Sequence, residues 1–109
     1  MEIATRTLTR TTPGGDQLVL IRIFAPVEAG QAWECAYAIA WPHGLAKGSA
    51  SGIDGIQALQ LALQKIGIEI YTSEYHRSGQ LAWKTPGDGY GFPLSPSMRD
   101  LYQGADRLL

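Results

Sequence analysis

Residues 54–70 read DGIQALQLALQKIGIEI, and this stretch carries the clearest structural signal in the chain. Apolar residues recur at spacings of three and four, which predicts an amphipathic helix with one face toward a core; they are Ile56, Leu59, Leu63, Ile66 and Ile70. Asp54 followed by Gln57 resembles a capping box and marks the start. Gly67 costs a helix about 1 kcal/mol. Because the apolar register is kept across it, we expect the helix to continue, although residues 68–71 could instead form a strand.

Four segments before this helix have the composition of strands. Residues 2–11 are rich in Thr, residues 17–25 are strongly apolar, and the turn between them, residues 13–16, predicts a hairpin. Pro26 ends the second strand, and residues 27–31 are expected to form a turn. Residues 32–41 alternate with a period of two, and residues 44–52 could add a short fourth strand.

The strand at residues 32–41 has two contrasting faces. One face carries Trp33, Cys35, Tyr37, Ile39 and Trp41, and the other carries Ala32, Glu34, Ala36, Ala38 and Ala40. Large aromatic groups can fill a core, whereas small residues let another element approach closely. The pattern therefore leaves open which of the two faces the helix covers.

The segment after the helix is expected to be mostly irregular. Residues 81–83 resemble a short strand, and residues 85–96, with three prolines and three glycines, predict a long surface loop. A last short helix would begin at Ser97 with Met98, Leu101, Tyr102 and Ala105 on one side. The chain is thus predicted to be one α+β domain over residues 1–109, with an antiparallel sheet of three to five strands on one long helix and a short C-terminal helix.

Composition narrows the classes of function. The 109 residues include nine Lys and Arg and ten Asp and Glu, with no basic block. Nucleic-acid binding usually requires a clustered basic face, and membrane-surface binding a basic amphipathic helix, so we expect neither. The N-terminal residues lack the apolar segment of a signal peptide. A single cysteine excludes an internal disulfide, and a cytoplasmic location is expected.

Residues that could carry chemistry have simpler structural interpretations. Cys35 lies among aromatics in a strand and is expected to be a buried, inert thiol. His43 and His76 are expected to be solvated, and the spacing of potential ligands matches no metal site. Asp16, Asp54 and Asp88 fit turns or caps. The glycine-rich runs lack the order of a phosphate-binding loop. We therefore predict no catalytic residue, no metal and no cofactor.

Aromatic residues are the remaining signal for a binding site. Trp41, Trp83, Tyr90 and Phe92 lie at strand ends or in the proline-rich segment, and His43 lies beside Trp41. Such residues either plug the open end of a small sheet or line a binding cleft, because aromatics with a polar group are favoured at interfaces. Both interpretations stay open.

Several motifs together resemble a family of small bacterial proteins of unknown function. They are GIDGIQALQLAL at residues 52–63 followed by Ile66-Gly67, RTL at residues 6–8, GQLAW at residues 79–83 and GFPL at residues 91–94. The resemblance spans most of the chain and implies a bacterial, cytoplasmic domain. It brings no assigned activity and no residue roles.

Three hypotheses for function follow. The first is a non-enzymatic interaction or regulatory domain that binds a protein partner, because the chain is small and shows no catalytic constellation. The second is a small-molecule-binding domain or an unrecognised enzyme, with a cleft lined by the aromatic residues named above. The third is a homodimer formed through a free sheet edge or the aromatic face.

Overall fold

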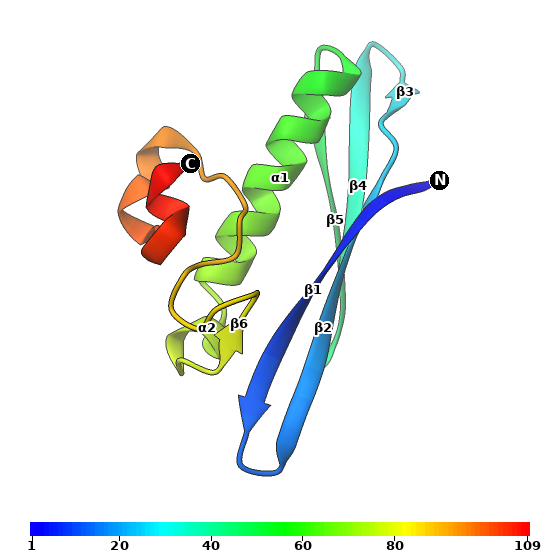
Figure 1. Cartoon of the computed structure of the whole chain (residues 1–109). Coiled ribbons are helices and arrows are strands. Elements are labelled where there is room, and N and C mark those ends of the chain that lie inside the picture. The colour runs from blue at the N-terminus through cyan, green and yellow to red at the C-terminus, as the bar shows by residue number, and fades with distance from the viewer.

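The computed structural model describes residues 1–109 and shows an α+β fold in which a long helix crosses one face of a six-stranded antiparallel sheet (Figure 1). The strands are β1 (Glu2–Thr12), β2 (Gly15–Phe24), β3 (Val27–Ala29), β4 (Ala32–Trp41), β5 (Gly44–Gly52) and β6 (Leu81–Ala82). The helices are α1 (Gly55–Tyr71) and α2 (Glu74–Arg77), followed by two 3-10 helices, η1 (Pro96–Leu101) and η2 (Gly104–Leu108). The predicted fold class is confirmed, and the strand count is higher than expected.

The sheet contains more strands than expected because strand pairing resumes where the sequence predicted that a strand would end. Its order is β3-β4-β2-β1-β6, and β5 pairs with the other edge of β4. Val27 to Ala29, predicted as a turn, pair with Glu34 to Ala32. Pro26 lacks a backbone N–H and interrupts the ladder, but β3 resumes along the same edge of β4 that β2 uses. The possible strand at residues 44–52 is present as β5 and pairs along nearly all of β4.

Helix α1 begins and continues as its sequence predicts. The Asp54 carboxylate accepts the Gln57 N–H at 2.8 Å, and the Gln57 side chain accepts the Ile53 N–H at 2.7 Å. The helix runs through Gly67 to Tyr71, so the alternative strand at residues 68–71 is wrong. A Cβ at Gly67 would lie 2.8 Å from the Pro93 carbonyl oxygen, because the C-terminal segment packs directly on this turn.

The buried face of α1 is narrower than the predicted apolar stripe. Ala58, Ala62, Ile66 and Ile70 are fully buried, whereas Ile56 is 69% exposed. Small side chains face the sheet near the start of the helix, where the Gly52 backbone almost touches Ala58. This close approach leaves Ile56 outside the contact, so its assignment to the core face was wrong.

Helix α1 covers the aromatic face of β4. Cys35, Tyr37, Ile39 and Trp41 are buried beneath it, and Tyr37 lies across Gly48 of β5, where any Cβ would overlap the ring. The alanine face of β4 is on the side of the sheet that no helix covers (Figure 1). The structure thus decides between the two faces that the sequence left open.

The C-terminal segment packs beside α1 on the same side of the sheet (Figure 1), and its residues Tyr90 and Gly91 accept hydrogen bonds from Arg6 of β1. The predicted surface loop at residues 85–96 is wrong in its second half, because Tyr90, Phe92 and Leu94 are at most 5% exposed. The predicted last helix is present as η1 and η2, which are separated at Tyr102. Tyr102 is buried while Met98, Leu101 and Ala105 are exposed, because the interruption between η1 and η2 leaves only the Tyr102 side chain facing the core. No helix is long and apolar enough to cross a membrane.

Candidate functional site

The five residues predicted to bind a ligand fall into separate regions. Trp41 ends β4 and His43 lies in the two-residue turn between β4 and β5, and both line one hollow together with residues of α2. Trp83 and Phe92 line two other hollows, one each. Tyr90 is 2% exposed and belongs to the core. The structure brings Trp41 and His43 together and places the other three elsewhere.

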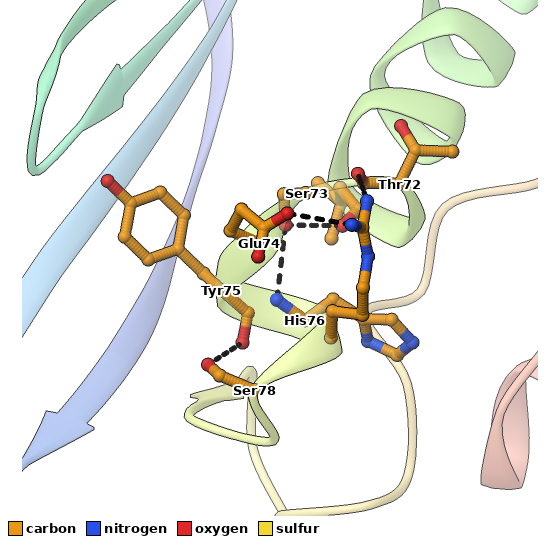
Figure 2. Close-up of polar contacts among 8 residues, drawn as sticks. Thr72, Ser73, Glu74, Tyr75, His76 and Ser78 are labelled. Carbon is orange, nitrogen blue, oxygen red and sulfur yellow. Dashed lines mark hydrogen bonds and ion pairs between the residues drawn. The ribbon is translucent and has the colours of Figure 1, made fainter.

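His76 is half-buried, which corrects its assignment as a solvated residue. Its Nδ1 lies 2.5 Å from the Tyr90 hydroxyl, and its ring meets Tyr71 edge-on. Burial lowers the pKa of His76, since the charged imidazolium would lose hydration there. Figure 2 shows the neighbouring Tyr75 pointing away from His76, on the other side of α2. Two consecutive residues therefore serve different parts of the molecule.

A buried carboxylate that the sequence analysis missed holds the C-terminal segment in place. Asp106, 3% exposed, accepts the Tyr71 hydroxyl at 2.5 Å and the N–H groups of Tyr90 and Gly91 at 2.7 and 2.8 Å. Gly89 has a positive φ, and a Cβ there would overlap the carboxylate. Burial raises the pKa of Tyr71, and the nearby Asp106 raises it further. We call Asp106 with these three donors the aspartate clamp.

Arg6 of β1 completes the packing around the clamp. Its guanidinium donates to the carbonyl oxygens of Tyr90 and Gly91 at 3.0 and 3.1 Å. Its Cζ lies 3.8 Å from the ring centroid of Trp83 and 4.8 Å from that of Phe92. These two aromatics thus stack on a cation of the protein itself. Nothing in the RTL motif at residues 6–8 indicated that Arg6 would contact the C-terminal segment.

Cys35 is buried, as predicted from its strand. Its Sγ lies 3.3 Å from the Phe24 carbonyl oxygen, where β2 ends. Burial raises the pKa of the thiol, because a thiolate would be poorly solvated. No group of three or more His, Cys, Asp or Glu side chains is arranged to hold a metal ion.

The largest hollow lies on the uncovered face of the sheet and has a volume of about 550 Å³. Its floor is the alanine face of β4, with Ala36, Ala38 and Ala40. Its walls are longer side chains of the two neighbouring strands, β2 and β5; they are Leu20, Arg22, Phe24, Leu45 and Lys47. We call this feature the alanine trough.

Strand register explains the shape of the alanine trough. Ala38 stands opposite Arg22 on β2 and opposite Lys47 on β5, so one methyl group lies between two long side chains. Cross-strand neighbours on one face lie about 5 Å apart, which places long side chains along both sides of the alanine row. The sequence analysis identified the alanine face without recognising that its neighbours build walls.

The walls of the alanine trough combine exposed apolar groups with positive charge. Leu45 is 60% exposed, and Leu20 and Phe24 are half-buried. Arg22 pairs with Glu2 at 3.4 Å, whereas Lys47 makes no ion pair. No Asp or Glu lines the trough. It is therefore an apolar channel with a cationic rim.

Comparison with known proteins assigns the family of the chain. Searches of curated proteins and of solved structures find no match. A family model described as a domain of unknown function, DUF6968, matches residues 4–94. The match includes the alanine trough and Trp41, His43, Trp83, Tyr90 and Phe92, while Asp106 lies beyond it. Since the match covers most of its length, the chain belongs to the DUF6968 family.

Proposed function

We propose that the chain is a protein-binding domain and that the alanine trough accepts an α-helix of a partner protein. The observation that carries the proposal is the uncovered sheet face, where apolar groups form one continuous channel. Contiguous apolar surface on a folded protein marks an interaction site more often than isolated exposed residues do. An amphipathic helix in a groove is a recurring mode of recognition.

The dimensions of the trough favour a helix. Its walls stand on strands two apart, so their spacing is about 9.5 Å. An α-helix, about 10–12 Å wide with its side chains, would therefore lie over both walls and insert one row of its side chains between them. Ala36, Ala38 and Ala40 leave room above the floor for the side chains of such a helix.

The charge of the trough indicates which helix would fit. Lys47 has no acidic partner within the chain, and Arg22 lies opposite it across Ala38. A partner helix with an apolar stripe edged by Asp or Glu would complement Lys47, whereas Arg22 already pairs with Glu2. A second copy of the trough presents only cations at these positions. We therefore favour a different protein over a homodimer, and place this binding in the bacterial cytoplasm because a free, buried cysteine suits a reducing compartment.

Site-specific photocrosslinking in the source organism tests the proposal. A photoreactive residue at Ala36, in the trough, is expected to form one covalent adduct whose attached peptide is an acid-edged amphipathic helix. The same residue at Gln60, exposed on α1, is the control and should not form this adduct. Leu45→Glu should abolish the adduct, since it adds an anion to the wall and Leu45 is too exposed to be needed for folding.

Two results would reject the proposal. An adduct formed only between copies of the chain would indicate a homodimer. Equal adducts at Ala36 and Gln60 would show that the trough is not a binding surface.

A further inference from the structure

A second hollow lies on the helix-covered side of the sheet, away from the alanine trough. It has a volume of about 390 Å³ and opens between the β4–β5 turn and the junction of α1 with α2. Trp41 comes from the end of β4, His43 from the turn, Tyr75 from α2, and Glu69 from the last turns of α1. We call it the junction hollow.

One wall of the junction hollow is aromatic. The rings of Trp41 and Tyr75 stack with centroids 5.2 Å apart and an interplanar angle of 14°. The His43 ring lies 5.8 Å from that of Tyr75 at 12°, and His43 Nδ1 is 2.7 Å from the Tyr75 hydroxyl. Tyr75 points away from His76 (Figure 2), and its ring forms the middle of this wall. Three parallel rings thus present an ordered, polarizable surface.

The other wall is negatively charged. Glu69 and Glu74 line it, and the hollow lies at the C-terminal end of α1, where the helix dipole is negative. No basic residue lies in the last turn of α1. Glu74 pairs with Arg77 at 2.7 Å, so its charge is partly compensated.

Glu69 has no cation partner in the protein. It makes no ion pair, and its Oε2 is buried without a hydrogen bond. Burial raises the pKa of Tyr37, and hydrogen bonding with Glu69 and the charge of its carboxylate raise it further, so a neutral hydroxyl lies against this carboxylate. Arg10 Cζ lies 4.8 Å from the Tyr75 ring centroid, so Tyr75 already carries one cation, but Arg10 donates to the side-chain oxygens of Gln80 and Gln17 and makes no ion pair with Glu69. Glu69 therefore keeps an uncompensated charge beside the aromatic wall.

We propose that the junction hollow binds an organic cation with N–H donors, namely a primary ammonium or guanidinium group on an apolar stem. The carboxylate of Glu69 has no ion pair in the chain and favours a charged donor, and aromatic faces attract cations and cover apolar stems. A metal ion fits less well, since the hollow does not gather three or more metal-binding side chains. Such a group occurs both on free amines and on the Lys or Arg side chains of another protein.

Titration monitored by ¹H–¹⁵N NMR tests the site with defined probes. n-Pentylammonium and n-butylguanidinium are expected to shift the indole N–H signal of Trp41 and the backbone signals of Thr72 and Ser73. The indole signal of Trp83, which lies in another hollow, should stay unchanged. 1-Pentanol has the same apolar stem without the charge, and it should produce no saturable shift.

A matched pair of variants separates the effect of the Glu69 carboxylate on binding from the effect of the overall charge of the protein. Glu69→Gln keeps the side-chain size and is expected to raise the Kd of n-pentylammonium about tenfold or more, the effect of losing a charged hydrogen bond. Glu28→Gln makes the same change on exposed β3 and should leave the Kd unchanged. If Glu69→Gln does not fold, the comparison with 1-pentanol still decides.

The outcomes show whether the bound cation is a free amine or a side chain of another protein, and which result would reject the proposal. A short peptide with one central lysine that binds at least tenfold tighter than n-pentylammonium would identify a protein side chain as the ligand. Equal or weaker binding of the peptide would identify a free amine. Absence of a Trp41 shift with both cations, or an equal shift with 1-pentanol, would overturn the proposal.

Discussion

Replacing Asp106 with asparagine is the sharpest test of the aspartate clamp. The substitution keeps the shape of the side chain but removes its charge and turns one acceptor oxygen into a donor amide. Oδ2 accepts two hydrogen bonds, from Tyr71 and Tyr90, whereas Oδ1 accepts one, from Gly91. The amide nitrogen is therefore expected to take the Oδ1 position, where it faces the Gly91 N–H.

The magnitude follows from these three contacts. The two hydrogen bonds kept by Oδ2 become neutral and lose about 1 kcal/mol each, and a buried unpaired N–H costs about 1–3 kcal/mol. Relief from burying a charge offsets part of this loss. We expect Asp106→Asn to lower the free energy of unfolding by about 2–4 kcal/mol. For a chain of this length that corresponds to a fall in Tm of about 8–16 °C.

Urea denaturation followed by circular dichroism, with a thermal scan, measures the effect. Asp100→Asn makes the same chemical change at an exposed position of η1 and should stay within about 0.5 kcal/mol of the parent protein. If Asp106→Asn unfolds within that same margin, the carboxylate does not hold the C-terminal segment and the clamp is refuted.

Three further predictions concern other buried contacts. Gly67→Ala should destabilise the protein by about 1 kcal/mol in urea denaturation, because overpacking against the Pro93 carbonyl exceeds the helix-propensity gain; a more stable variant would show that the C-terminal segment does not press on α1. Burial lowers the pKa of His76, so this histidine binds a proton more readily in the unfolded chain than in the folded one. The free energy of unfolding should therefore fall as pH drops from about 7 to about 5, and His76→Gln should reduce this pH dependence in denaturation curves. An unchanged pH dependence in the variant would contradict this. Cys35 should react with a thiol reagent at least about 100-fold more slowly in native buffer than in urea, since it is buried and its pKa is raised; equal rates would show an accessible thiolate.

Residues of the candidate sites differ in how far the sequence could predict them. Trp41 and His43 were predicted as binding candidates, and the structure gives them shared surroundings in the junction hollow. Glu69 and Tyr75 were not, because their proximity to Trp41 depends on how α1 and α2 lie over β4. Asp106 carried no signal either, since its donors are 15 to 35 residues away in the chain.

The sequence by itself determined the local elements. The Asp54 cap, the helical period of apolar residues in α1 and the alternation of β4 each depend on neighbours within a few residues, and each predicted its element correctly, although Ile56 lies outside the buried face. Tertiary structure alone decided which face of β4 would be covered, because both faces are largely apolar and local alternation cannot rank them. It also decided that Tyr90, Phe92 and Leu94 are buried and that the C-terminal segment packs against Gly67, since these contacts join segments distant in sequence. The alanine trough arises for the same reason: its floor is a pattern within one strand, but its walls come from two others.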